Sequence, residues 1–259
     1  NVGATSRRTE FSQQGVTSDQ QSIFGVFRHY NFATAQPVQR DETQNIVGVY
    51  AQTEFGYDNF AYLTLAARND WVSNFFENSI FYPSASLSIL PTSIIDGLQS
   101  QNGLNFLKLR AGYGTSAGYP SPYSTRGTLD TFTKMFQTAA GSIMNSNAVS
   151  NFYANPNLKP EIHKELELGI EGRFWKNRIG IDVSLYNKDS EDLIIDLELD
   201  PSTGYTSSTV NSAAINNKGI EAIVNVIPVQ TQNFTWDISA NFTLNRSEVT
   251  KIADGIDQV

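Results

Sequence analysis

The sequence has 259 residues, of which 17% are charged and 40% hydrophobic, so it has the composition of a folded chain rather than a disordered one. Its net charge is −8 with scattered Lys and Arg, which argues against a nucleic-acid partner, and the absence of Cys excludes disulfides, thiolate metal sites and Cys nucleophiles. The charged fraction lies below the roughly 25% of ordinary soluble domains, while uncharged polar residues and aromatics are abundant, as in the lumen and loops of a membrane β-barrel.

The apolar residues recur with the period of a strand. No run approaches the 18 apolar residues of a transmembrane helix, but a membrane-spanning β-strand needs only about 9–11 residues with every second one apolar. The opening residues have no signal-peptide pattern, so we expect a mature or internal portion of an exported protein. In chain order the alternation predicts nine strands, with a weaker tenth at 5–16: 21–34, 43–56, 58–70, 79–90, 104–114, 161–174, 178–190, 213–227 and 234–248.

The clearest strand covers residues 234–245, twelve residues that alternate without an error. Soluble strands usually stop after about five or six residues, so this length favours a strand that crosses a membrane. Its apolar face comprises Phe234, Trp236, Ile238, Ala240, Phe242 and Leu244, and its polar face Thr235, Asp237, Ser239, Asn241, Thr243 and Asn245.

The connections alternate in length along the chain. Short turns are expected at 57–59, 175–177 and 228–233, with a modest link at 91–103. Longer connections rich in Gly, Ser and Asn are expected at 35–42, 71–78, 114–160 and 191–212. Short turns at one end and long loops at the other are typical of bacterial outer-membrane barrels, in which the long loops are extracellular.

Aromatic residues gather near both predicted strand ends. Such bands resemble the girdles at the two lipid–water interfaces of a barrel, although aromatics favour strand ends in other β proteins too. Near the short turns lie Phe55, Tyr57, Phe60, Trp175, Phe234 and Trp236, and near a long loop lie Phe75, Phe76, Phe81 and Tyr82.

Several motifs resemble those of a known family. NPNLKPE at 155–161, leading to GIEGRF at 169–174, resembles a hallmark of TonB-dependent transporter barrels. Five further segments, in order and at barrel-strand spacing, are similar to the SusC/RagA branch from Bacteroidetes: LTLAARND at 63–70, YPSASLS at 82–88, LKLRAGYG at 107–114, YNKDSEDLI at 186–194 and NNKGIE at 216–221. The resemblance covers roughly residues 43–250.

The resemblance implies an all-β, antiparallel transmembrane barrel of about 22 strands around a plug, located in the outer membrane. It also implies import of large nutrients, either glycans or peptides, with a SusD-like surface lipoprotein as lid and energy from the TonB complex acting through the plug. We expect residues 1–259 to be a central-to-C-terminal part of such a barrel, because no plug domain or Ton box is recognisable. Nine antiparallel strands cannot close on themselves, so they need partner strands, unless the segment at 5–16 makes ten and a small barrel.

Catalytic and metal chemistry is not expected. His163 shares a strand face with Glu161, Glu165 and Glu167, but a hydrated barrel wall accounts for this pattern better than a metal site. The acidic residues between positions 189 and 200 lack the glycine-pivoted EF-hand spacing. No phosphate loop, nucleophile elbow or marked pair of carboxylates is present, so we predict a non-enzymatic protein without a cofactor.

The candidate ligand-binding residues lie in the connection 114–160. Aromatic planes there can stack on sugar rings or peptide side chains, and loops on a rigid scaffold commonly carry binding. The alternative is a loop that packs over the barrel mouth or against a lid subunit. The candidates are Tyr119, Tyr123, Arg126, Phe132, Phe136, Phe152 and Tyr153.

A different functional class is also open at this point. A soluble all-β carbohydrate-binding or adhesin module would pack the apolar strand faces into a sandwich core. It predicts strands of about five to six residues and no sorting of loop lengths by end. An enzymatic barrel is the third possibility, but it lacks visible catalytic residues.

Overall fold

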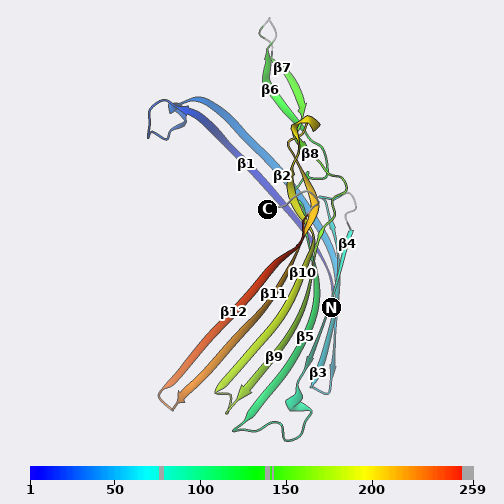
Figure 1. Ribbon diagram of the computed structural model, residues 1–259, viewed down its shortest axis with the longest axis vertical. Coiled ribbons are helices and arrows are strands. Elements are labelled where there is room, and N and C mark those ends of the chain that lie inside the picture. Colours follow the sequence, from blue (N-terminus) through cyan, green and yellow to red (C-terminus); the bar gives the residue numbers. More distant parts are fainter. Residues whose placement is uncertain (76–78, 138–140, 142, 253–259) are drawn as a thin grey trace.

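The protein is described from a computed structural model, which covers residues 1–75, 79–137, 141 and 143–252, with the backbone alone within 130–137 and 143–146. Nine antiparallel strands form one curved sheet in which chain neighbours pair (Figure 1). They are β1 (Val2–Gln21), β2 (Phe32–Tyr57), β3 (Ala61–Val72), β4 (Ser79–Ile89), β5 (Leu104–Gly118), β9 (Glu161–Phe174), β10 (Ile179–Glu198), β11 (Ser207–Gln230) and β12 (Thr235–Lys251).

The remaining elements lie in the connections. β6 (Leu129–Gln137) and β7 (Ile143–Val149) form a separate hairpin, and β8 (Phe152–Tyr153) adds a short parallel pairing to the start of β11. Three short 3-10 helices, η1 (His29–Asn31), η2 (Pro91–Ser93) and η3 (Pro201–Thr203), lie between strands. Within the described residues, no helix is long and apolar enough to cross a membrane.

Tight turns are confined to one end of the sheet. Asp58 and Asn59 have φ of 44° and 56° between β2 and β3, the pair of positive values that a type I′ hairpin requires. Trp175, Lys176 and Asn177 also have positive φ between β9 and β10. Residues 231–234 join β11 to β12 at the same end. Three of the four connections at this end are therefore short. The fourth, 90–103, is longer than the connections 22–31 and 199–206 at the other end, so the expected sorting is confirmed only in part.

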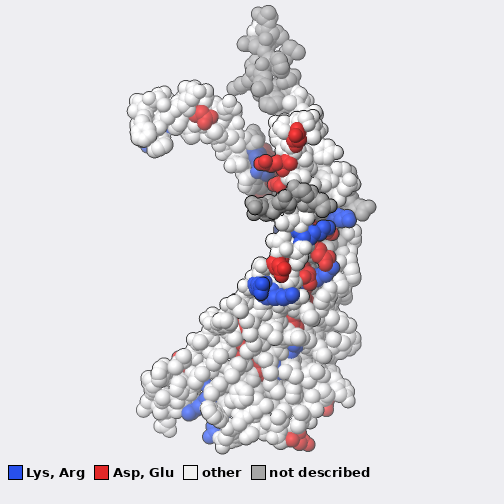
Figure 2. Space-filling view, viewed as in Figure 1, with Lys and Arg blue, Asp and Glu red and all other residues white. Residues whose placement is uncertain are grey.

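The strand register gathers the apolar side chains on one face. A continuous row crosses eight strands, and most of its large members are exposed, because no second layer covers them in the described chain: Phe55, Leu63, Leu87, Ala111, Leu168, Leu185, Ile220 and Leu244. Figure 2 shows that the lower strands are almost without charge on the face in view. A sandwich would bury such a row against a second sheet, so the soluble-module prediction is wrong about the architecture.

The conventional core is correspondingly small. Among the described residues, the hydrophobic side chains that are buried are Val72, Phe75, Ile80 and Leu158, with Tyr82 and Tyr119 packed against them. This group, called the root cluster below, lies where β3, β4 and the connection 119–160 meet. Stability of the rest of the sheet must come from the backbone ladder and from whatever covers the apolar face.

Three predicted ranges are wrong. The strand expected at 21–34 is a connection, residues 22–31, while the weak segment at 5–16 belongs to β1 and the loop expected at 35–42 lies inside β2. The loop expected at 191–212 is also shorter than predicted. β10 continues to Glu198 and β11 begins at Ser207, so the connection is 199–206. In 35–42 most side chains are exposed, and in 191–198 the apolar residues Leu193, Ile194 and Ile195 are consecutive where the register of β10 shifts, so neither segment shows the apolar alternation that marks a strand.

The connection after β5 spans 119–160 and contains β6, β7 and β8, close to the loop expected at 114–160. The sheet is open, as the strand count predicted: β1 and β12 each pair on one side only in the described chain. Trp71, Phe81 and Tyr113 lie near the long-connection end of the apolar face and Phe55, Tyr57, Trp175 and Trp236 near the short-turn end. Phe75 and Tyr82 point instead into the root cluster, and Phe76 lies outside the described residues.

Candidate functional site

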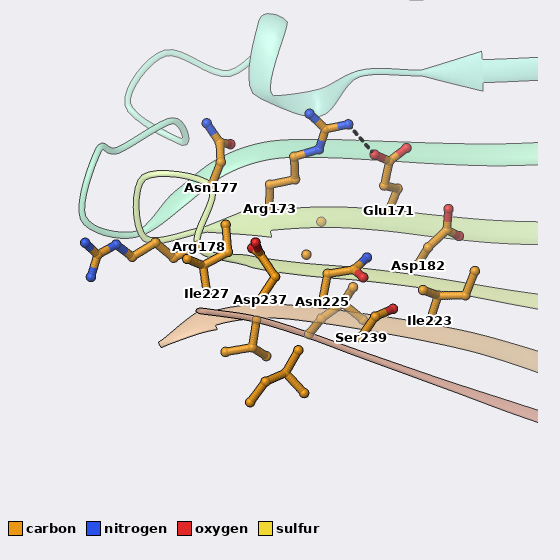
Figure 3. Close-up of a pocket in the computed structure, with 15 residues that line it drawn as sticks. Glu171, Arg173, Asn177, Arg178, Asp182, Ile223, Asn225, Ile227, Asp237 and Ser239 are labelled. Atoms are coloured by element: carbon orange, nitrogen blue, oxygen red, sulfur yellow. Dashed lines mark hydrogen bonds and ion pairs between the residues drawn. The ribbon is translucent and has the colours of Figure 1, made fainter. Parts of the chain in front are cut away.

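The face opposite the apolar row is polar and hollowed. Near the short turns it forms a groove of about 540 Å³, in which Arg173 donates to Glu171 at 2.9 Å. Figure 3 shows Asp182, Asn225 and Ser239, from β10, β11 and β12, lying along the same groove. Ile223 and Ile227 also line the groove, so it offers polar groups beside apolar surface.

Arg110 is the centre of an ion-pair network on this wall. Its guanidinium donates to both carboxylate oxygens of Asp182 at 2.7 and 3.2 Å, and to Ser184 Oγ at 3.1 Å. A carboxylate oxygen of Glu171 lies 3.9 Å from Arg110 Nη1. A bidentate contact of this kind holds both side chains in one geometry. It indicates that the polar face is rigid at this point.

The contact between Arg110 and Asp182 depends on a glycine of β9. Arg110 is on β5 and Asp182 on β10, so the side chain must cross β9, and it does so over Gly169. A Cβ at Gly169 would lie 2.7 Å from Arg110 Nη2, too close for any other residue to fit without movement.

The same arrangement occurs twice more on the polar face. Tyr186 of β10 crosses β11 over Gly219 and donates to Asn245 Oδ1 on β12 at 3.2 Å. Arg68 of β3 passes beside Gly48 of β2 and donates to Thr5 Oγ1 on β1 at 2.8 Å. We call these three contacts the glycine crossings. These contacts were not predicted from the sequence, although in each of them a glycine and a long polar side chain lie on adjacent strands.

His163 is part of the same wall. Its Nδ1 lies 2.8 Å from Ser190 Oγ and its Nε2 lies 3.7 Å from a Glu161 carboxylate oxygen. Across the described part of the chain, no three potential metal ligands converge on one point. Asp200 accepts from the backbone N–H of Ser202 at 2.8 Å, and the hydrogen bonds of this turn hold its pKa below the usual value.

Tyr119, the first of the candidate binding residues, lies at the root of the connection 119–160. Its hydroxyl donates to Asp70 at 3.3 Å and its ring packs edge-on against Phe75, with centroids 6.3 Å apart. Asp70 is 4% exposed and also contacts Arg68 and Tyr82. Burial raises the pKa of the Tyr119 hydroxyl well above its ordinary value. Tyr119 is half-buried, and these contacts attach the start of the connection to β3 and β4.

Hydrogen bonds from side chains to backbone carbonyls hold both ends of the connection 119–160 in place. Asn74 Nδ2 donates to the carbonyl of Pro120 at 2.8 Å, and Thr125 Oγ1 donates to the carbonyl of Asn74 at 2.8 Å. On the return side, Asn155 Nδ2 donates to the carbonyl of Thr209 at 3.0 Å. Asn74 and Thr125 are buried. Both ends of the connection are thus tied to the sheet, while the hairpin between them projects (Figure 1).

The other candidates are spread over three places. Tyr123 and Arg126 are exposed on a turn at 121–126, where the Arg126 N–H donates to the Tyr123 carbonyl at 3.1 Å. Phe132 and Phe136 are on β6, and their side chains lie outside the described residues.

Phe152 and Tyr153 form β8, next to the start of β11. The Tyr153 ring meets Tyr205 in a T-shaped contact, with centroids 4.9 Å apart. Tyr205 precedes β11 in the connection 199–206 and was missed, because it lies about fifty residues from its partner in the sequence. The structure therefore joins part of the candidate set to a second connection and does not bring all seven residues together.

The sequence profile of the TonB-dependent receptor-like β-barrel matches residues 2–258. The chain belongs to this family. Its members are outer-membrane proteins, so the apolar row faces lipid and the polar wall faces the lumen.

Relatives at the sequence level include the TonB-dependent receptor P3 of Formosa agariphila, 31% identical over 228 residues, which cover 86% of this chain and 22% of P3. SusC of Bacteroides thetaiotaomicron is 33% identical over 104 residues, 40% of this chain and 10% of SusC. The chain thus spans about a fifth of the length of the Formosa relative.

Solved structures agree on the fold. The RagAB peptide importer in its open-open state matches with a TM-score of 0.74 at 20% identity, covering 98% of this chain and 28% of that one. The ferripyoverdine receptor of Pseudomonas aeruginosa matches with a TM-score of 0.57 at 14% identity, over 97% of this chain and 30% of the receptor. Together these matches confirm the SusC/RagA-like resemblance and the partial-barrel fold.

Proposed function

We propose that this chain forms part of the barrel wall of a TonB-dependent importer that carries large nutrients, either glycans or peptides, across the outer membrane. The observation that carries the proposal is the two-faced sheet: one continuous apolar row for lipid and, behind it, a hydrated wall braced by the glycine crossings. The transport activity is proposed because the chain belongs to the TonB-dependent receptor family. The protein acts without catalysis, by binding and by passage through the barrel.

Two partners are part of the proposal. A SusD-like surface lipoprotein covers the outer mouth, and the TonB complex supplies energy through a plug. The similarity to SusC and to the two-component RagAB importer supports both partners. The long connections mark the outer end, as in other bacterial barrels.

Cargo is proposed to bind at the outer mouth through the projecting hairpin β6–β7 and the Tyr153–Tyr205 pair. The position of these two elements in the structure supports this proposal. The root cluster fixes both ends of the connection, so the hairpin is presented from a rigid base, and rigid presentation lowers the entropy lost on binding.

The test is uptake by cells that produce the full-length protein, with fluorescent oligosaccharides and oligopeptides as separate probes. We expect energy-dependent uptake of one class, and loss of most of it when residues 129–149 are replaced by a short Gly-Ser linker. A matched control shortens the connection 90–103, at the opposite end of the sheet, by two residues, leaving the hairpin and Tyr205 intact. If neither probe enters under any condition, the import proposal is wrong; if uptake survives the deletion, the hairpin is not the binding element.

A further inference from the structure

The last part of the connection 119–160, residues 151–159, lies beside the start of β11. Regular strand pairing between the two covers the two residues of β8 (Figure 1). Ahead of β8, the Thr206 N–H donates to the Asn151 carbonyl at 2.8 Å. Beyond β8, hydrogen bonds from side chains make the contact in place of a backbone ladder. We call residues 151–159 the return segment; its position on the sheet depends on a few side chains.

Ser208 holds the return segment at β8. Its Oγ donates to the carbonyl of Tyr153 at 2.8 Å, and Ser208 is 4% exposed. The Tyr153 ring is the one that meets Tyr205, in the connection 199–206. Since a buried carbonyl that loses its donor costs more than an ordinary hydrogen bond contributes, Ser208 fixes the backbone of Tyr153 strongly.

Asn211 holds the return segment at its far end. Its side-chain amide lies against the backbone of Lys159: Oδ1 accepts from the Lys159 N–H at 2.8 Å, and Nδ2 donates to the Lys159 carbonyl at 2.8 Å. Nδ2 also donates to the carbonyl of Asp192 at 2.7 Å, where the register of β10 shifts. Both donors of the amide are therefore used, and they tie the return segment to β11 and to β10.

These bonds determine whether the Tyr153–Tyr205 pair exists. One ring belongs to the connection 119–160 and the other to 199–206, so the two rings meet only while the two connections are held together. Ser208 is buried and both N–H groups of Asn211 have partners, so neither residue offers a free donor to cargo. Their effect on a site at the rings is through the backbone.

We infer that Ser208 and Asn211 are positioning residues of the cargo site, which join the connections 119–160 and 199–206 into one unit without touching cargo. The inference rests on the proposed function, because that function places cargo at the Tyr153–Tyr205 pair. While the connections are joined, cargo meets a preformed pair of rings and does not have to order them. When they are separated, cargo affinity falls, whereas the rate at which bound cargo moves inward is unchanged.

The experiment uses the full-length protein, in cells for uptake and in mild detergent for hydrogen exchange. The double variant Ser208→Ala/Asn211→Asp removes one hydroxyl donor and both amide donors, and changes the size of the side chains little. The matched control Ser207→Ala/Asn157→Asp makes the same chemical changes on β11 and in the return segment. The control side chains have no hydrogen-bond partner in the part of the chain that the structure describes.

Hydrogen–deuterium exchange, read by mass spectrometry, measures whether the two connections are joined. In the double variant we expect the amides of 151–160 and of 199–206 to exchange at least about tenfold faster, because three hydrogen bonds between the segments and the sheet are lost. The control should exchange as the wild type does. Unchanged exchange in the double variant overturns the inference, since other contacts then hold the connections together.

Uptake of the fluorescent oligosaccharides and oligopeptides measures the consequence for cargo. For the probe that enters, the double variant should need about tenfold more probe for half-maximal uptake, with a maximal rate within about twofold of wild type. Adding the pair Asn151→Cys/Thr206→Cys, at the two positions joined by a backbone hydrogen bond, should restore half-maximal uptake at the wild-type concentration when oxidised but not when reduced.

The remaining outcomes separate this inference from the proposed function. If the double variant exchanges faster but reaches half-maximal uptake at the wild-type concentration, import stands and the positioning role is wrong. An equal loss in the control, or a loss that the oxidised cysteine pair does not reverse, attributes the effect to general destabilisation and also overturns the role. Wild-type cells that take up neither probe overturn the import proposal, and the positioning role with it.

Discussion

Adjacent residues of one strand face different solvents in this protein, and Leu168 and Glu167 show the contrast most simply. Leu168 belongs to the lipid-facing row, between Ala111 and Leu185, whereas Glu167 lines the lumen beside Tyr186. We expect Leu168→Arg to destabilise the folded barrel by about 2–4 kcal/mol, the usual cost of a cation near the bilayer midplane. Glu167→Arg meets water and should change stability much less. Urea titration of the full-length protein in lipid vesicles measures both, and equal effects would refute the assignment of faces.

The glycine crossings predict a second contrast between neighbouring strands. Gly169→Ala should displace the Arg110 guanidinium and weaken its contact with Asp182, at a cost of about 1 kcal/mol, because the displaced atoms are the end of a flexible and partly exposed side chain. Gly112→Ala is the matched control, because a Cβ there would meet Ser86 at an ordinary 3.9 Å.

A double-mutant cycle identifies the cause of the loss. If Gly169→Ala acts by displacing Arg110, it should cost much less in an Arg110→Ala background, since the two residues share one interaction. Additive losses in unfolding free energy would mean that Gly169 matters for another reason, such as the backbone of β9.

At the scale of elements, the root cluster decides how the connection 119–160 behaves. Tyr119→Phe removes the hydroxyl that donates to buried Asp70 but keeps the ring against Phe75. We expect faster proteolysis within the connection, by roughly the fivefold that corresponds to about 1 kcal/mol, with little change in cargo affinity. Tyr123→Phe, on the exposed turn, should change neither. A large loss of cargo affinity in Tyr119→Phe would restore Tyr119 as a binding residue.

The limits of sequence-based prediction also follow the elements. Strands were predicted well where one face meets lipid, as at 234–248, because lipid enforces the alternation. Beyond the membrane this alternation is lost: most side chains of 35–42 are exposed, and a register shift in 191–198 places apolar residues in succession. The candidate residues separate for a related reason: Tyr119 is half-buried by its contacts with Asp70 and Phe75, which are distant from it in the sequence.

At the scale of the whole molecule, the sheet combines a long backbone ladder with very little core. Both outer strands, β1 and β12, have an unpaired edge in the described chain, and the solved relatives are three to four times as long as the part matched. Unpaired backbone groups cost several kcal/mol each in lipid. The sheet is therefore stable in a membrane only when further strands close it.

This requirement gives the last prediction, in which residues 1–259 and the full-length protein are refolded separately into the same detergent and lipid vesicles. The full-length barrel should resist SDS at room temperature and change its gel mobility only on heating, because every strand edge is paired. The 259-residue chain should remain sensitive to SDS and to protease, since nine antiparallel strands leave two parallel outer strands that cannot close the antiparallel ladder. A heat-modifiable, monomeric species of 28.7 kDa would mean that the chain closes on itself as a small barrel, and the large-barrel architecture would then be wrong for it.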